Sequence, residues 1–481
     1  MRDNDQKSAA APNGLFRVPE DGTLATAIAT VADCGVIRVA AGIHTVTESL
    51  RITRSLKIQG AGAGLTRIQA AKNVPLVSAS GQGSVVISGL TLAARTVLTS
   101  LVQLDVAQFC VRDCQFLGPF SMSQEKPRRR WPLNLAYAHC AALEISSGHG
   151  TVSGSTFRGH ACGIAIHGPG SHAELRDNEC VENGRDGVRV ASGATADAAG
   201  NLCADNLGRG IFFFGQACGS ATDNLCAANG QSGISVALES SARLSGNHCQ
   251  GNSRSGICVM GHSTAEIHEN VCMDNMASLE GGITVEDHSE AKVTGNHCAG
   301  NAGPNINVTQ YSKAEVRDNL CEKNGQDAGI SIDSGSEGLV TGNRCFKNRL
   351  GGIWILDAKG WIQDNICEGS ALLEVGILVL SSEAEILNNR CTNFMAGIKV
   401  GDSPGCMLRN NICEKNAHEG INVTNAKADL IGNRCTGNRQ SGIYFSSNST
   451  GKLHCNVCTG NGWRGIFLNT SGDVHLHANQ E

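Results

Sequence analysis

The chain is dominated by a repeat of about 23 residues in which apolar, small and polar positions recur in a fixed order. The unit reads N-x-C-x-x-N-x-x-x-G-I-x-V, followed by a small or polar turn and then by A-x-L or A-x-V. Two of its runs, such as 233–236 and 242–244, alternate in the way that is typical of β-strands. The N-x-C segment predicts a third strand. Three short strands in one such period fit one coil of a parallel β-helix.

Cysteines mark the repeat most clearly. Thirteen of them are each preceded two positions earlier by Asn, and eleven are followed three positions later by Asn. In a coil the Cys, Ile and Val positions point inward, and each stacks on its copy in the next coil about 4.8 Å away. The Asn positions then form ladders whose amides satisfy buried polar groups, and the cysteines form a ladder of packed free thiols. These cysteines are Cys180, Cys203, Cys226, Cys249, Cys272, Cys298, Cys321, Cys345, Cys367, Cys391, Cys413, Cys435 and Cys458. Cys258 lies outside this ladder at an outward position, and we expect it to be the most reactive thiol.

The pattern predicts a single domain. We expect a flexible N-terminus over 1–14 and an all-β, single-stranded right-handed parallel β-helix of about 17 coils over 15–481. An amphipathic segment at about 20–33 predicts a helix that caps the open end of the core. Phe116 and Phe157 both take the Cys position but stand 41 residues apart, which predicts a loop insertion at about 117–139.

Composition narrows the class of protein. Glycine accounts for 59 of 481 residues, charged residues for 17%, and the formal net charge is −5, which is typical of a turn-rich β protein and disfavours nucleic acid as a partner. No stretch has the 18 or more apolar residues of a membrane span. Because the N-terminus of the sequence lacks the apolar core of a secretory signal, we expect a cytoplasmic protein with reduced thiols.

These motifs resemble the right-handed parallel β-helix superfamily, the pectin-lyase-like fold, over nearly the whole chain. Its members with similar repeats include carbohydrate-binding and sugar-hydrolase domains, copper-associated periplasmic proteins and F-box proteins, so the resemblance implies a scaffold and not one reaction. Most of the family's catalytic motifs are missing. Gly148-His149-Gly150 copies the G-H-G of polygalacturonases, but without the paired carboxylates that glycoside hydrolysis needs.

A basic loop is the first candidate for a binding site. The expected insertion carries basic and aromatic residues. We expect them to reach the same side as arginines on the following coils, with His160 and His167 nearby. Arginine suits a carboxylate or phosphate ligand. Outward aromatic residues of the G-I-x-V strand suit stacking against sugar rings. A solvated loop and ordinary surface strand residues are the alternatives to this interpretation. The candidate ligand-binding residues are Arg128, Arg129, Arg130, Trp131, Arg185, Arg189, Arg209, Phe212, Trp354 and Tyr444.

A polar column at the turn after the G-I-x-V strand is the second candidate. Glu239, His262, His288 and Tyr311 fall at the same position of four successive coils, which would bring a carboxylate, two imidazoles and a phenol into proton-transfer range. A solvent-exposed column of turn residues is the alternative. Lyases of the superfamily often hold calcium with carboxylates, and this resemblance implies that any cofactor is Ca²⁺ at Glu286, Asp287 and Asp333.

Two functions remain open. The sequence favours an intracellular recognition scaffold that binds an extended anionic glycan or a partner protein along its exposed face. The alternative is a polysaccharide lyase, glycoside hydrolase or epimerase that acts on an acidic polysaccharide.

Overall fold

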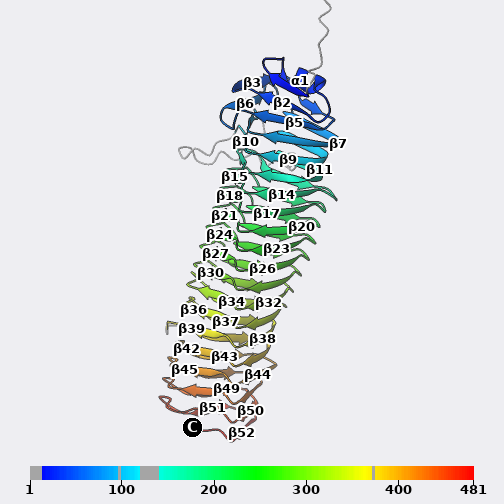
Figure 1. Cartoon of the computed structure of the whole chain (residues 1–481). Helices are drawn as coiled ribbons and strands as arrows, with labels where there is room; N and C mark the ends of the chain where they lie inside the picture. Colours follow the sequence, from blue (N-terminus) through cyan, green and yellow to red (C-terminus); the bar gives the residue numbers. More distant parts are fainter. Residues whose placement is uncertain (1–13, 96–98, 120–139, 371–373) are drawn as a thin grey trace, which may run out of the picture. The chain divides into compact units, whose positions relative to one another are not determined.

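The chain folds as an all-β parallel solenoid of about 19 turns with almost no helix (Figure 1). The computed structural model describes residues 14–95, 99–119, 140–370 and 374–481. They divide into two compact units, unit 1 (Met1–Gly230) and unit 2 (Gln231–Glu481). The predicted fold class is confirmed. The turns exceed the expected 17, because the N-terminal part, which lacks the cysteine repeat, also forms regular coils.

Each coil contains three strand positions, which we name the first series (G-I-x-V), the second series (A-x-L) and the third series (N-x-C). In unit 1 the strands β7, β9 and β11 are long enough to supply both the first and the second series. The strands of unit 1 are β1 Leu15–Val18, β2 Gly35–Val39, β3 Gly42–Val46, β4 Leu50–Ile52, β5 Leu56–Gly60, β6 Thr66–Ala70, β7 Val77–Ser88, β8 Thr91–Ala93, β9 Val102–Arg112, β10 Gln115–Leu117, β11 Ala141–Ser153, β12 Thr156–Arg158, β13 Cys162–His167, β14 His172–Arg176, β15 Glu179–Val181, β16 Val188–Ala191, β17 Thr195–Ala199, β18 Leu202–Ala204, β19 Ile211–Phe214, β20 Cys218–Thr222 and β21 Leu225–Ala227.

Unit 2 repeats the three positions with little variation. Its first series is β22 Ile234–Ala237, β25 Ile257–Met260, β28 Ile283–Val285, β31 Ile306–Val308, β34 Ala328–Asp333, β37 Gly351–Leu356, β40 Val375–Leu380, β43 Ala396–Gly401, β46 Ile421–Thr424, β49 Ile443–Ser447 and β51 Ile466–Thr470. Its second series is β23 Ser241–Ser245, β26 Thr264–His268, β29 Glu290–Thr294, β32 Lys313–Arg317, β35 Glu337–Thr341, β38 Lys359–Gln363, β41 Glu383–Leu387, β44 Gly405–Arg409, β47 Ala428–Ile431, β50 Gly451–His454 and β52 Val474–His477. Its third series is β24 His248–Gln250, β27 Val271–Met273, β30 His297–Ala299, β33 Leu320–Glu322, β36 Arg344–Phe346, β39 Ile366–Glu368, β42 Arg390–Thr392, β45 Ile412–Glu414 and β48 Arg434–Thr436.

One short helix covers part of the N-terminal end of unit 1. Helix α1 spans Leu24–Thr30, inside the range that the sequence predicted, and buries Leu24, Ala27 and Ile28. Thr23 caps it by accepting a hydrogen bond from the backbone N–H of Thr26 at 3.2 Å. The apolar face of the helix therefore shields the first coils from water.

Asparagine ladders run inside the turns that precede and follow the third series. Asn319 illustrates the arrangement in unit 2. Its Nδ2 donates to the carbonyl oxygen of Val293 and to Oδ1 of Asn343, both at 2.9 Å, while its own Oδ1 accepts from Asn296 of the preceding coil. Each amide is thus shared between neighbouring coils, which satisfies turn groups that are shut off from water.

The cysteine ladder fills the core beside these amides. Within unit 1, β15, β18 and β21 pair in parallel so that Cys180, Cys203 and Cys226 lie in register. Phe116 and Phe157 occupy the preceding two positions, as predicted, and their rings stack at 4.5 Å. The expected insertion between them falls largely on residues 120–139, outside the described residues.

We expect Asn319→Ala to lower the free energy of unfolding by about 1–3 kcal/mol, because it leaves the buried partner groups of two coils unsatisfied. Urea unfolding followed by circular dichroism would measure the loss. Glu266→Ala is the control, since its ion pair with Arg243 is exposed and worth at most about 1 kcal/mol. Equal effects of the two changes would contradict the role given to the ladder.

The thiols give a second prediction. All 22 cysteines are free, and of these only Cys34, Cys218 and Cys455 are exposed. We therefore expect a thiol reagent to modify these three quickly in the native protein and to reach all 22 after denaturation. Intact-mass measurement before and after denaturation would count them. Fast native labelling of many more cysteines would show that the ladder is not closed to solvent.

Candidate active site on the first series of unit 1

The outward residues of the first series in unit 1 form a charged column. Parallel pairing places Gln103, Glu144, Ala165, Arg189 and Phe212 at the same position of successive coils, on β9, β11, β13, β16 and β19. Because strands alternate their side chains across the sheet, the Leu, Ile and Val residues beside them point inward to the core. The column therefore presents a carboxylate and a guanidinium that are separated by one small residue.

Glu144 and His167 form the central contact of this column. Nε2 of His167 lies 2.9 Å from Oε1 of Glu144, and Nε2 of Gln103 donates to the other carboxylate oxygen at 3.1 Å. Burial acts to raise the pKa of Glu144, but hydrogen bonds from His167, Ser100 and Gln103 outweigh it and hold this pKa below its ordinary value. The ionised carboxylate thereby fixes the orientation of the imidazole.

Arginines and aromatic rings lie on the next two coils. The guanidinium of Arg209 lies 3.9 Å from the centre of the Phe212 ring, and that of Arg189 lies 5.1 Å from the centre of the Phe214 ring. Asp186, which is buried, is within 3.9 Å of Arg209 and holds it in place. Arg189 and Arg209 thus both lie over the Phe212 ring. Phe212 is buried, so it does not present the exposed face that stacking against a sugar would need.

Of the other basic candidates, the structure describes Arg185 but not the residues of the loop. Arg185 is partly exposed and lies in the segment that leads into β16. Arg128, Arg129, Arg130 and Trp131 lie outside the described residues, so the basic loop stays a prediction.

His160, which the sequence suggested near this site, is a core residue. It is buried, and burial lowers its pKa to about 3, so it stays neutral. Glu144, in contrast, was missed by the sequence analysis. The signal was the run Leu143-Glu144-Ile145, whose alternation places the glutamate outward at the position that Arg189 takes two coils later.

The second candidate column is assembled as predicted, but in the open. His262 stacks on His288 with ring centres 5.1 Å apart, and His288 stacks on Tyr311 at 5.4 Å. Each, like Glu239, has a positive φ of 57–59°, which turns the side chain out of the coil. All four are exposed, Tyr311 by 66%. Stacked rings present parallel edges and not converging nitrogen atoms, so this column is a weaker catalytic site than the Glu144–His167 pair.

The other aromatic candidates lie on the first series of unit 2. Trp354 is partly exposed, and its buried Nε1 has no hydrogen-bond partner among the described residues. Tyr444 stacks on Phe467 at 5.4 Å. Because β37 and β49 are separated by three intervening strands of the series, Trp354 and Tyr444 do not form one platform.

A buried cluster surrounds Cys258, which the sequence suggested as the most reactive thiol. That expectation is wrong, because Cys258 is buried and desolvation raises its pKa well above the ordinary value. Its thiol donates to Oε1 of Glu286 at 3.6 Å. Glu280, which pairs with Arg254 and accepts a hydrogen bond from Ser255 at 2.9 Å, was missed because it lies in the irregular segment before β28.

The expected calcium ligands are not brought together as a metal site. Glu286 faces Cys258, Asp287 contacts His288 at 3.4 Å, and Asp333 accepts hydrogen bonds from Thr309 and Ser331. In the part of the chain that the structure describes, no three His, Cys, Asp or Glu side chains group in a way that would hold a metal ion. Glu286, Asp287 and Asp333 therefore do not form a calcium site.

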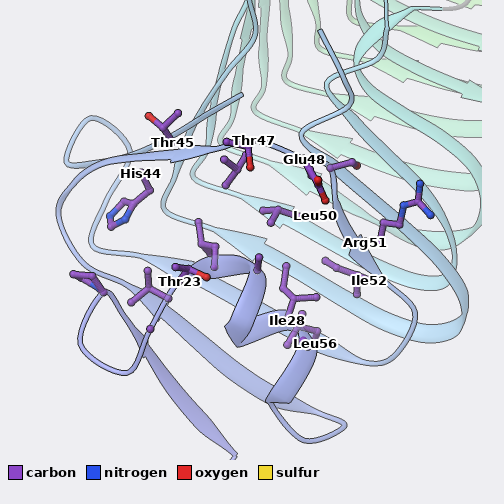
Figure 2. A pocket seen from close by; sticks show the side chains of 18 of the residues that line it. Thr23, Ile28, His44, Thr45, Thr47, Glu48, Leu50, Arg51, Ile52 and Leu56 are labelled. Atoms are coloured by element: carbon purple, nitrogen blue, oxygen red, sulfur yellow. The ribbon is translucent and has the colours of Figure 1, made fainter. Parts of the chain in front are cut away.

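A separate pocket of about 790 Å³ lies at the N-terminal end of unit 1, between α1 and the segment that joins β3 to β4. Figure 2 shows Ile28 and Leu50 on its apolar side and Glu48 and Arg51 near its polar side. The seven-residue helix is too short to cover the coil end completely, which leaves this space. It shares no lining residue with the Glu144 column.

Two protein families match parts of the chain. Residues 141–290 and 219–367 match the family described as right handed beta helix region, and residues 363–480 match the family described as periplasmic copper-binding protein (NosD). Together with the all-β solenoid, the first match fits the right-handed parallel β-helix, or pectin-lyase-like, superfamily. The sequence resemblance is therefore confirmed. No curated protein sequence matches the chain.

Solved structures are similar at low sequence identity. A mutant of the periplasmic alginate epimerase AlgG is 13% identical, with a TM-score of 0.36 and coverage of 71% of this chain and 77% of that one. The N-terminal fragment of bacteriophage Phi29 gene product 12 is 10% identical, with a TM-score of 0.40 and coverage of 98% and 92%. The PL6 family alginate lyase AlyGC is 9% identical, with a TM-score of 0.33 and coverage of 97% and 99%.

The cytoplasmic location expected from the sequence is wrong. Residues 363–480 match a family described as periplasmic, which points away from the cytoplasm. The cysteines gave no indication of the compartment, because thiols buried in a core stay free in either compartment. Among the described residues, no helix combines the length and the apolar character that a membrane crossing requires.

Glu286, which contacts Cys258 and lies near Glu280, gives a prediction about how the stability of the protein depends on pH. Burial, and then the charge of Glu280, raise the pKa of Glu286 above 4.5, so the folded state keeps this proton to a higher pH than the unfolded state does. Its contribution to stability is therefore lost as the pH rises from about 4.5 through the folded pKa. We expect Glu286→Gln to unfold at a higher temperature than the wild type at pH 7 but not below about pH 4.

Thermal unfolding followed by circular dichroism across this pH range would measure the difference. Glu290→Gln, a change at an exposed carboxylate on β29, serves as the matched control. If Glu286→Gln raised the unfolding temperature by the same amount at low pH as at pH 7, the raised pKa assigned to Glu286 would be wrong.

Proposed function

We propose that this protein is an enzyme that acts on an anionic, uronate-containing polysaccharide, and that it does so at the Glu144 column of unit 1. The observation that carries the proposal is the 2.9 Å contact between His167 and Glu144, on the two coils that precede those of Arg189 and Arg209. A carboxylate that orients an imidazole beside cationic groups is the arrangement that abstracts a proton next to a carboxylate.

The step follows from the hydrogen bond at Nε2. With its Nε2–H donated to the ionised Glu144, His167 presents the lone pair of Nδ1 as the base. Nδ1 takes the proton from C5 of a uronate, and the electron pair moves toward the uronate carboxylate, where Arg189 and Arg209 stabilise the charge. The C4–O4 bond then breaks, a C4–C5 double bond forms, and the imidazolium returns its proton to the leaving oxygen.

An epimerase would share the first half of this step and would return a proton to C5 from the opposite face. Elimination is the outcome that we favour, because one imidazole can both take the proton and deliver it to the leaving oxygen on the same face. Ala165, between Glu144 and Arg189, adds only a methyl group to this surface.

The Glu144–His167 contact favours an enzyme over the recognition scaffold that the sequence favoured. Such a protein needs a complementary surface and has no use for a half-buried carboxylate that orients an imidazole. Two of the similar solved structures are named as an alginate epimerase and an alginate lyase, but the likeness to them is one of fold alone. A polyuronate is the first substrate class to test, because the arginines beside the Glu144–His167 pair suit the carboxylates of such a chain.

We expect the purified protein to release unsaturated uronate ends from a polyuronate and to exchange the C5 proton for deuterium in D₂O. His167→Ala should lower the rate by about 10²–10⁴-fold, the usual contribution of a general base. Glu144→Gln should lower kcat because it favours the wrong tautomer. Arg189→Ala should weaken substrate binding and also lower kcat, because it removes a cation that stabilises the developing charge. Ultraviolet absorbance and mass spectrometry would follow the two products.

Arg243→Ala, which changes an exposed arginine on the second series of unit 2, is the matched control and should leave the rate unchanged. Saturable binding of the polyuronate without exchange or elimination would reject the enzyme in favour of the scaffold. An undiminished rate in His167→Ala would reject this site.

A further inference from the structure

A hollow of about 460 Å³ lies on the outer face of the second series of unit 2, a surface that the proposed reaction does not use. It extends over β35, β38, β41, β44 and the start of β47. Its volume is in the range of pockets that hold small ligands. The hollow is built by two outward columns of side chains.

The first column explains why the surface is hollow. Register places Glu337, Lys359, Glu383 and Gly405 at one position of successive coils, and Lys427 follows. The charges alternate, and Lys359 pairs with Glu383 at 3.8 Å. Gly405 interrupts this alternation, and a Cβ added there would meet nothing within 4 Å. The missing side chain leaves open space between Glu383 and Lys427.

The second column supplies an aromatic wall. Trp361, Glu385, Met407 and Asp429 lie in register on successive strands and line the same hollow. The indole of Trp361 is 43% exposed and stands on the same wall as Met407, which is 36% exposed. No ion pair of Lys427 occurs within the described residues, so its ammonium group remains available to a ligand.

This combination has the chemistry of a sugar site. The flat face of an indole packs against the C–H groups of a pyranose ring, and carboxylates and ammonium groups hydrogen-bond its hydroxyls. Four carboxylates line the hollow against two ammonium groups, so a uronate would be repelled where a neutral ring is not. The ligand chemistry of this surface therefore differs from that of the arginine-bearing column of unit 1.

We propose that this hollow binds a neutral hexopyranose unit of a glycan, with Trp361 as the stacking platform and with Glu385, Asp429 and Lys427 as hydroxyl ligands. The site holds a neutral glycan on the second series without acting on it. It does not depend on the reaction proposed for unit 1.

Isothermal titration of the full chain with neutral hexaoses of glucose, mannose and galactose, and with a hexauronate, tests the proposal. At least one neutral hexaose should bind saturably, and Trp361→Ala should weaken that binding by about tenfold or more, while Trp361→Phe retains part of it. Trp463→Ala is the matched control, because Trp463 is an exposed tryptophan of the same unit that does not line the hollow.

Gly405→Lys gives an independent check. The position has no positive φ and is open to a side chain, so the variant should fold, place an ammonium group beside Glu383 and fill the hollow. It should abolish binding of the neutral hexaose while leaving turnover of a polyuronate intact. The proposal is overturned if no neutral hexaose binds, if binding survives both Trp361→Ala and Gly405→Lys, or if the hexauronate competes at this site.

Discussion

Every turn of a stacked solenoid must satisfy its polar groups within one strand spacing, because the coils on either side shut out water. The asparagine amide does this with its donor and its acceptor on opposite sides. In unit 2, Asn270 donates to the carbonyl oxygen of Leu244 and to Asn296, and accepts from Asn247. Because the same bonds recur coil after coil, they set the register in which all other ladders align.

The thiol ladder depends on that register and fits the corrected location of the protein. Parallel, in-register strands hold the cysteines of successive coils side by side, where they pack as small apolar groups. These ladder thiols are buried, so solvent-borne reagents and oxidants do not reach them in the folded protein.

The outward positions are free of these constraints and carry the chemistry. On the first series of unit 1 they place a carboxylate–imidazole pair beside arginines, and on the second series of unit 2 they place an exposed indole among carboxylates. Both surfaces also rely on a small residue within the column, Ala165 in one and Gly405 in the other. Neither residue disturbs the core, since the inward positions next to it keep the repeat.

The period of the Asn and Cys positions was sufficient to predict the parallel solenoid, its ladders and the Phe116–Phe157 match, because inward residues repeat with the coil and stack on their own copies. The amphipathic pattern at about 20–33 separately predicted the short helix. The same spacing placed His262, His288 and Tyr311 at one position of successive coils, where their rings stack. The tertiary structure alone decided that this column is exposed, that Cys258 and His160 are buried, and that Glu144 reaches His167. Outward side chains do not repeat, and their contacts depend on how far each one extends over its neighbours, which spacing along the chain does not encode.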